Sequence, residues 1–317
     1  MILDIVLLAF GIATIYLGGQ LLIDGSSSIA KRFGMPALLI GVMIIAPGTS
    51  APELFLGAIS AAQGVPGVSV GNVIGSTVAI VTLVLGIGAI IAPIISRFDE
   101  VRRESYVAVI AAVLFLLMAL DRRIVWWEGV IMLATFFIYM RWAYRCIRRC
   151  KVTYAVREEY EDIAIERPLM MSLSMLGLSI VALALGAELA VEGAVGLADG
   201  FGISEVVIGA TIVSIGTVMP ELTITIMAAL KGKQDLAIGN VLGTVLFNTM
   251  VVTGTASLIT DVTFTGKVVF PGMVLIICMS LLLVFVLKKN EGITRSMGFV
   301  LLMVYGLFIG LILALAL

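Results

Sequence analysis

The residues best suited to chemistry occur in a six-residue motif that the chain carries twice, each time inside an apolar segment. The motif is Gly-Thr-x-x-Pro-Glu, and it runs from Gly48 to Glu53 and again from Gly216 to Glu221. Its proline lacks a backbone N–H and interrupts a helix, so each motif places a carboxylate beside freed backbone carbonyls. A carboxylate inside a membrane segment is costly unless another group neutralises it. We therefore expect a cation to lie between the two motifs.

The two motifs offer oxygen ligands and no sulfur or imidazole. Beside the two carboxylates, the predicted ligands are the hydroxyl groups of Thr49, Ser50 and Thr217, and the carbonyl groups of Ala46 and Ser214, which the breaks at Pro52 and Pro220 are expected to free. Calcium accepts six to eight oxygen ligands in flexible geometry, whereas zinc and copper prefer softer ligands. Two negative charges match one divalent cation. When that ion leaves, repulsion and desolvation favour refilling of the site by sodium or protons, which is a physical basis for exchange.

Two alternatives for these residues stay open. The hydroxyl groups could bond to their own helices while the glutamates pair inside the protein, although no basic residue lies in the apolar parts of the segments concerned. A Gly-Asn pair follows each motif, at Asn72 and Asn240, and either caps a helix break or belongs to the ligand shell.

Composition places the motifs in a membrane protein. The 317 residues are 61% hydrophobic and 13% charged, with a mean hydropathy of +1.18 and apolar runs along the whole length. The net charge of -1 gives no reason to expect a nucleic-acid partner, and the chain contains no histidine. The three cysteines form no metal-binding pattern. No resident cofactor and no oligomer are implied, and the first apolar run lacks the basic start of a signal peptide.

Ten segments are long enough to cross a bilayer, so we predict an all-α polytopic membrane protein. They lie near residues 2–30, 36–62, 68–95, 104–120, 124–145, 169–198, 204–230, 236–259, 266–287 and 296–316.

The two halves of the chain are copies. A constant offset of 168 residues aligns Thr49 with Thr217, Glu53 with Glu221 and Asn72 with Asn240. Each half holds five segments, an odd number, so the second copy must enter the membrane from the opposite side. Such inverted repeats are typical of secondary transporters, which bind substrate near the midplane where broken helices meet. We place the first repeat at 1–123, with its fifth helix running to about 145, a cytoplasmic linker at 146–168 and the second repeat at 169–317.

The basic residues predict the orientation. With the N-terminus outside, sixteen Lys and Arg residues fall in inside connections, and only Arg122, Arg123 and Lys267 fall outside. Both termini are therefore expected outside the cytoplasmic membrane of a prokaryote.

Two inverted five-helix halves, each with Gly-Thr-x-x-Pro-Glu followed by Gly-Asn-x-x-Gly-Ser/Thr, resemble the calcium/cation antiporter superfamily, and the prokaryotic sodium/calcium exchangers most of all. The resemblance covers essentially the whole chain. It implies that Glu53, Glu221, Thr49 and Thr217 bind calcium at the midplane. It also implies that sodium uses neighbouring positions, namely Ser50, Ser76, Thr244, Asn248 and the carbonyls of Ala46 and Ser214.

Three positions depart from the family pattern. Val218 stands where a serine is common, Ile80 where a polar residue is expected, and Asn248 where an aspartate is frequent. The chain is thus expected to exchange calcium for sodium by alternating access and not to be an enzyme. Calcium/proton exchange with reduced sodium sites is the main alternative. A cation channel and a homologue that does not transport are further ones.

Overall fold

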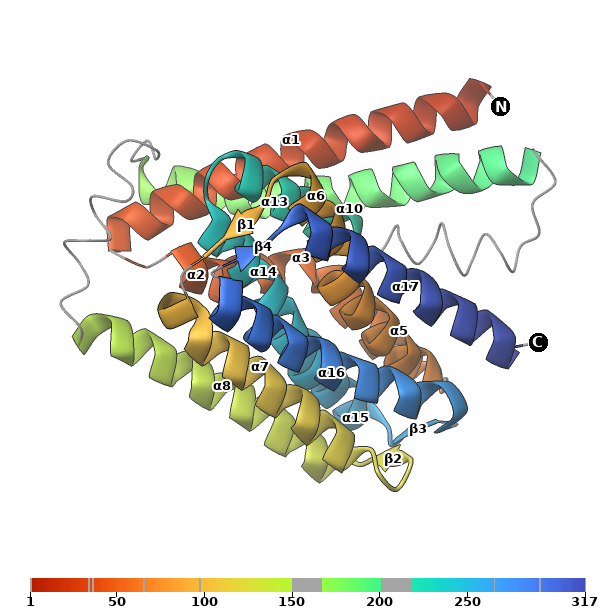
Figure 1. The fold of residues 1–317 in the computed structure, drawn as a ribbon. Helices are drawn as coiled ribbons and strands as arrows, with labels where there is room; N and C mark the ends of the chain where they lie inside the picture. Colours follow the sequence, from red (N-terminus) through yellow and green to blue (C-terminus); the bar gives the residue numbers. More distant parts are fainter. Residues whose placement is uncertain are drawn as a thin grey trace.

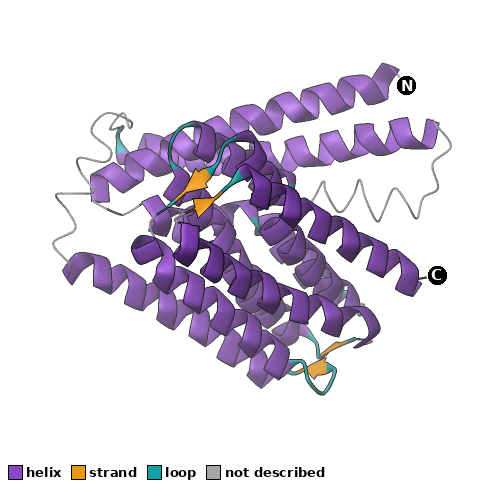
Figure 2. Ribbon diagram, viewed as in Figure 1, coloured by secondary structure: helices purple, strands orange, loops and turns teal. Residues whose placement is uncertain are grey.

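The computed structural model describes residues 2–33, 35, 37–64, 66–96, 98–149, 167–200, 218–264, 266–290 and 292–316. Thr217, Ser214 and most of the predicted linker lie outside these residues. The described chain is a bundle of helices with four two-residue strands at its ends, as Figures 1 and 2 show.

The elements of the first half are mostly helices, four of which adjoin two short π-helical stretches. They are α1 (Ile2–Phe33), α2 (Ala37–Ile40), η1 (Gly41–Ile45), α3 (Ala46–Thr49), α4 (Ala51–Ala62), α5 (Pro66–Ala79), η2 (Ile80–Val84), α6 (Leu85–Ile91), β1 (Ile94–Ile95), α7 (Phe98–Met118), β2 (Arg123–Ile124) and α8 (Trp126–Arg149).

The described part of the second half repeats most of these elements. They are α10 (Leu169–Gly200), α13 (Met219–Leu230), α14 (Gln234–Leu246), η4 (Phe247–Val252), α15 (Thr253–Ile259), β3 (Val262–Thr263), α16 (Gly266–Asn290), β4 (Gly292–Ile293) and α17 (Arg295–Ala316). Adding 168 to the bounds of α4, α6 and β1 gives the bounds of α13, α15 and β3. The strands pair between the halves, antiparallel, as β1 with β4 and β2 with β3. The repetition seen in the sequence is therefore also a repetition of structure.

Helices α1 and α10 lie side by side along one edge of the bundle (Figure 1). Glycines allow their backbones to approach closely. A Cβ atom at Gly186 would lie 2.8 Å from the nitrogen of Ile15, and one at Gly18 would lie 3.2 Å from the nitrogen of Leu183. The offset of 168 converts one contact into the other, since it carries Ile15 to Leu183 and Gly18 to Gly186. The pair is thus antiparallel and pseudo-symmetric, as an inverted repeat requires.

Five described helical segments are long and apolar enough to cross a membrane, and a bent pair would make a sixth. The pair is Leu38–Thr49 with Ala51–Ala62, which meet at an angle of 47°. The described residues thus show fewer than the ten predicted spans. Charged residues fill the start of α7, and the predicted span 204–230 runs through residues that are not described.

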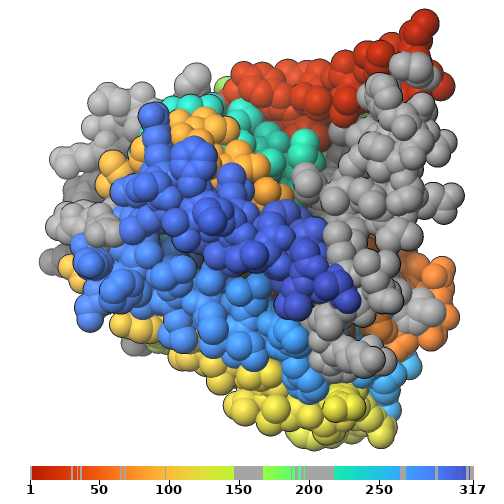
Figure 3. Space-filling view, turned by 45° about the vertical axis from the view of Figure 1, so that its right-hand side comes forward, coloured from red at the N-terminus to blue at the C-terminus, as the bar shows by residue number. Residues whose placement is uncertain are grey.

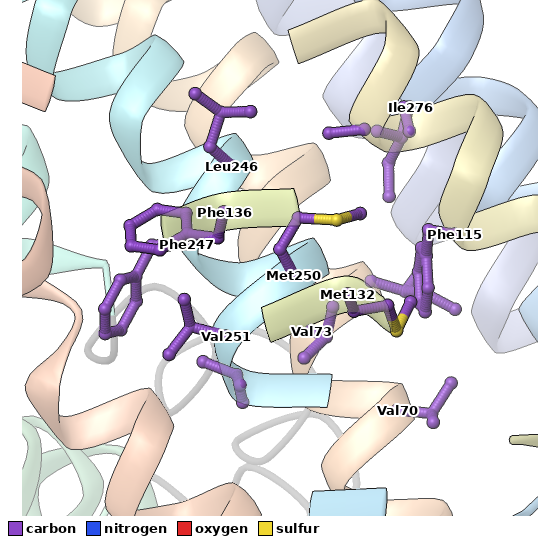
Figure 4. Close-up of a cluster of buried hydrophobic side chains, with 14 of the residues drawn as sticks. Val70, Val73, Phe115, Met132, Phe136, Leu246, Phe247, Met250, Val251 and Ile276 are labelled. Carbon is purple, nitrogen blue, oxygen red and sulfur yellow. The ribbon is translucent and has the colours of Figure 1, made fainter. Parts of the chain in front are cut away.

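Large apolar side chains pack the space between the helices. Figure 4 shows one such cluster, in which Phe115 and Met132 are fully buried. The ring of Phe136 on α8 meets that of Phe247 edge-on, with centroids 6.0 Å apart. This contact holds η4 against α8, and η4 carries Asn248. On another face, α16 and α17 lie at the surface (Figure 3).

Candidate functional site

Both copies of the motif bend the chain at the same position. The first bend is at Ser50, with φ -88° and ψ 10°, between α3 and α4. Val218 has nearly the same conformation before α13, with φ -97° and ψ 7°. A proline two residues later, Pro52 or Pro220, stands in the first turn of the next helix, where its missing N–H costs least. The motif therefore places each glutamate in the first turn of a new helix.

The carbonyl group of Ala46 is not freed by this bend, so that prediction was wrong. Its oxygen accepts a hydrogen bond from the nitrogen of Ser50 at 2.9 Å and another from the hydroxyl of Thr49 at 3.2 Å. The physical reason is the helical register, because the N–H that Pro52 lacks would have reached Gly48, four residues earlier. The equivalent prediction for Ser214 lies outside the described residues.

The two carboxylates lie in the interior and close enough for their charges to interact. Glu53 is 1% exposed and Glu221 is 0% exposed. The hydroxyl of Ser50 donates to Oε1 of Glu221 at 3.2 Å, across the two halves. The other three carboxylate oxygens are buried and have no hydrogen-bond partner among the described residues. Buried oxygens without donors are expensive, and a cation bound between them would remove that cost.

Hydroxyl and amide groups surround the carboxylates. The hydroxyl of Thr49 donates to the carbonyls of Ile45 and Ala46 in its own helix, at 3.2 Å in each case. This agrees with the alternative in which the hydroxyl groups bond to their own helices. A hydroxyl that donates its proton in this way keeps its oxygen lone pairs available to a cation. The same oxygen lies 3.5 Å from Oδ1 of Asn240, and Ser50 lies 3.5 Å from the hydroxyl of Thr244.

A second polar contact also joins the two halves. The amide nitrogen of Asn248 donates to the hydroxyl of Ser76 at 3.0 Å, and Ser76 donates to the carbonyl of Asn72 at 2.8 Å. Oδ1 of Asn248 is buried without a partner among the described residues. Ile80, the equivalent of Asn248 in the first half, is fully buried within an apolar cluster.

The two asparagines of the Gly-Asn pairs differ in their surroundings. Asn240 is fully buried, and its amide nitrogen donates to Thr225 at 3.4 Å. Asn72 is half-buried, and its amide nitrogen has no partner in the described part of the chain. Thr225 was not predicted from the sequence. Thr225 follows Glu221 by four residues and therefore lies on the same face of α13, and this spacing could have predicted it as a site residue.

No basic side chain neutralises these acids in the part of the chain that the structure describes. The ion pairs there join other residues, such as Lys231 with Asp24 and Arg123 with Asp261. No group of three or more His, Cys, Asp or Glu side chains occurs among the described residues either. The candidate site thus consists of two carboxylates surrounded by neutral oxygens, which are the ligands that hard cations prefer.

Comparisons with known proteins agree with this arrangement. The family model described as "Sodium/calcium exchanger protein" matches residues 3–145 and 171–314. The sodium/calcium exchanger MaX1 of Methanosarcina acetivorans is 27% identical over an alignment of 340 residues, which covers 96% of this chain and 97% of MaX1. An uncharacterized membrane protein of Methanocaldococcus jannaschii is 34% identical over 243 residues, or 77% of this chain and 78% of that protein.

The fold is also similar to a solved structure. The sodium-calcium exchanger NCX_Mj, soaked with Na⁺ and Ca²⁺, superposes with a TM-score of 0.82 at 29% sequence identity, covering 98% of both chains. MaX1 and NCX_Mj are ion exchangers and not enzymes. This multi-pass helical membrane protein belongs to the sodium/calcium exchanger family.

Proposed function

We propose that the protein exchanges calcium for sodium across the membrane and that the two glutamates hold the calcium ion. Glu53 and Glu221 would bind the ion together with Thr49 and Thr217. Ser50, Ser76, Thr244 and Asn248 would contribute to sodium binding. The carbonyl of Ala46 is a weaker candidate than the sequence suggested, since its oxygen already accepts two hydrogen bonds. The carbonyl of Ser214 stays a predicted sodium ligand.

One observation carries this proposal. Three of the four carboxylate oxygens of Glu53 and Glu221 are buried and lack a donor among the described residues, and no basic side chain there pairs with either acid. Two carboxylates match the charge of one calcium ion. Sodium ions would replace calcium and keep the site neutral, so that one ion class occupies it at a time and alternating access yields exchange.

The test is uptake of radioactive calcium into vesicles loaded with sodium. We expect uptake to require an outward sodium gradient. Glu53→Gln and Glu221→Gln should each reduce uptake to background, because the site then holds one negative charge too few for calcium. Glu192→Gln, which removes an exposed acid on α10, serves as the matched control and should transport normally. Normal exchange by either Glu53→Gln or Glu221→Gln would contradict the assignment.

Calcium/proton exchange is the second candidate, and two buried apolar residues favour it. Val218 and Ile80 stand where the sequence pattern would place polar side chains, and both are fully buried. Fewer oxygens near the carboxylates would weaken sodium binding more than proton binding. Calcium uptake that follows an imposed pH gradient and ignores sodium would select this function.

We further propose the orientation and the repeat boundaries given by the sequence. Repeats at 1–123, with its last helix to about 145, and at 169–317 would flank a cytoplasmic linker at 146–168 in a prokaryotic cytoplasmic membrane. Both termini would lie outside. A C-terminal alkaline phosphatase fusion should then be active and a C-terminal fluorescent protein fusion dark, and the opposite result would reverse the orientation.

A further inference from the structure

A cavity opens between α16, α17 and the η2–α6 segment, and none of the residues that line it belongs to the candidate ion site. Its volume is about 240 Å³, and every side chain that lines it is apolar. The residues that matter here are Val81, Leu85, Leu283, Phe285, Met297 and Val300. A space of this size lined only by apolar side chains suits a segment of an alkyl chain.

The cavity opens on the outer face of the molecule. Phe285 on α16 is 60% exposed and Val300 on α17 is 53% exposed, whereas Leu283 at the inner wall is buried. Both helices carry further large apolar side chains that are exposed. Figure 3 shows that the two helices lie at the surface of the molecule. In a protein that spans a membrane, such a face lies against lipid, so acyl chains are the apolar molecules that reach the cavity first.

Positive charges lie at one end of the cavity. Lys288 and Lys289 are exposed in the last turn of α16, and Arg295 is exposed at the start of α17. The amino group of Lys289 lies 5.9 Å from the centroid of Phe285, which lines the cavity. No carboxylate among the described residues forms an ion pair with these three side chains. Glu291, which is close in sequence, lies outside the described residues.

We propose that this cavity is a binding site for an anionic phospholipid of the bilayer. One acyl chain fills the space between α16 and α17, and the phosphate group pairs with Lys288, Lys289 and Arg295. The lipid chain then contacts Val81 and Leu85, in the helix that continues from Ser76 of the candidate ion site. Basic residues at the end of a membrane helix attract anionic lipids, which agrees with this assignment.

The pseudo-symmetry of the chain supplies the most direct variant. The positions equivalent to Leu283 and Val300 in the first half are Phe115 and Met132, and both are fully buried in the cluster of Figure 4. At the position equivalent to Leu283, the first half thus has the larger side chain of Phe115. Leu283→Phe copies that residue into the cavity and is expected to fill it without a polar or charged change.

The experiment measures the retention of phosphatidylglycerol by the full-length protein in native mass spectrometry, with phosphatidylcholine as the competitor. Wild type should retain one phosphatidylglycerol in preference to phosphatidylcholine. Leu283→Phe should weaken retention of both lipids about ten-fold, the effect of removing a few buried methylene groups. The control Leu281→Phe changes an exposed leucine of the same helix outside the cavity and should bind as wild type.

The charged end is tested separately, with surface variants that leave the interior unchanged. Lys288→Gln combined with Lys289→Gln should remove the preference for phosphatidylglycerol. Arg141→Gln combined with Arg145→Gln, two exposed cations on α8, should keep it. The proposal would be overturned if Leu283→Phe retained phosphatidylglycerol as well as wild type does. It would also be overturned if wild type bound phosphatidylglycerol and phosphatidylcholine equally. A dimer that Leu283→Phe disrupts would assign the face to a second copy and likewise overturn it.

Discussion

At the scale of single residues, the two halves of the site are unequal. Ser50 donates a hydrogen bond to Glu221, and the equivalent donor to Glu53 would come from position 218. That position holds a valine, which packs in an apolar cluster. Both oxygens of Glu53 consequently lack a partner among the described residues, whereas Glu221 lacks one for Oε2 only. One substitution of Ser by Val therefore changes the environment of one carboxylate and leaves the other intact.

Restoring the hydroxyl should strengthen sodium binding. Val218→Ser would place an oxygen where Ser50 stands in the other half, and each added neutral oxygen suits a hard cation. We expect the sodium concentration that halves calcium uptake to fall several-fold, while calcium affinity changes less. Val218→Ala is the control, because it removes the same methyl groups without adding an oxygen. An equal response of the serine and alanine variants would place position 218 outside the ligand shell.

At the scale of elements, the turn between α13 and α14 holds α1 through two lysines. Lys231 pairs with Asp24 at 3.1 Å, and the amino group of Lys233 donates to the hydroxyl of Ser27 at 2.5 Å. The equivalent positions in the first half are Gln63 and Val65 in the sequence, so neither lysine is repeated. The turn between α13 and α14 thus contacts α1 through charged side chains, and the equivalent turn of the first half has no lysine at these positions.

Lys233 should make stability depend on pH in a defined window. Burial, together with the nearby charge of Lys231, lowers its pKa from 10.5 to about 8, and Asp24 opposes the change. Between these two pKa values the unfolded chain holds more protons than the folded one. The free energy of unfolding contributed by Lys233 therefore rises as the pH increases from about 8 to 10.5.

Thermal unfolding in detergent near neutral pH and near pH 9.5 tests this expectation. Wild type should gain stability at the higher pH relative to Lys233→Gln. Lys289→Gln, which removes an exposed lysine, should change with pH as wild type does. If the stability of wild type and of Lys233→Gln changed with pH in the same way, the pKa of Lys233 would not be lowered in the folded protein, and the expectation would be wrong.

At the scale of the whole molecule, the halves are joined by contacts that obey the 168-residue offset. Backbone approach at Gly186 and Gly18 joins α10 to α1, and the paired strands join the loops. At these two glycines the interface leaves no room for a side chain, while Ile15 of α1 and Leu183 of α10 pack beside them in one buried cluster. Small residues of this kind allow close packing of helices within membranes.

Two glycines of α10 should therefore respond oppositely to alanine. A Cβ atom at Gly186 would meet the backbone of α1 at 2.8 Å, whereas one at Gly177 would meet nothing within 4 Å. Gly186→Ala should lower the free energy of unfolding by about 1–3 kcal/mol through overpacking. Gly177→Ala should raise it by up to about 1 kcal/mol through helix propensity. Thermal unfolding of both variants checks this, and equal effects would refute the close approach.

Features that depend on local pattern could be predicted from the order of the residues. Apolar runs predicted the helices, and a constant offset of 168 residues revealed the duplication. The buried location of Glu53 and Glu221 was also predictable, because a carboxylate in an apolar segment must find compensation inside the protein. These inferences need only residue types and their spacing along one chain.

The contacts between side chains of different helices became known only from the three-dimensional fold. The donation from Ser50 to Glu221, the contact of Asn248 with Ser76 and the place of Thr225 each join residues from different helices. The π-helical stretches and the occupied carbonyl of Ala46 also escaped prediction. Hydropathy and periodicity report whether a position is buried. They do not report which atoms it faces, because that depends on how closely the helices of the two halves pack.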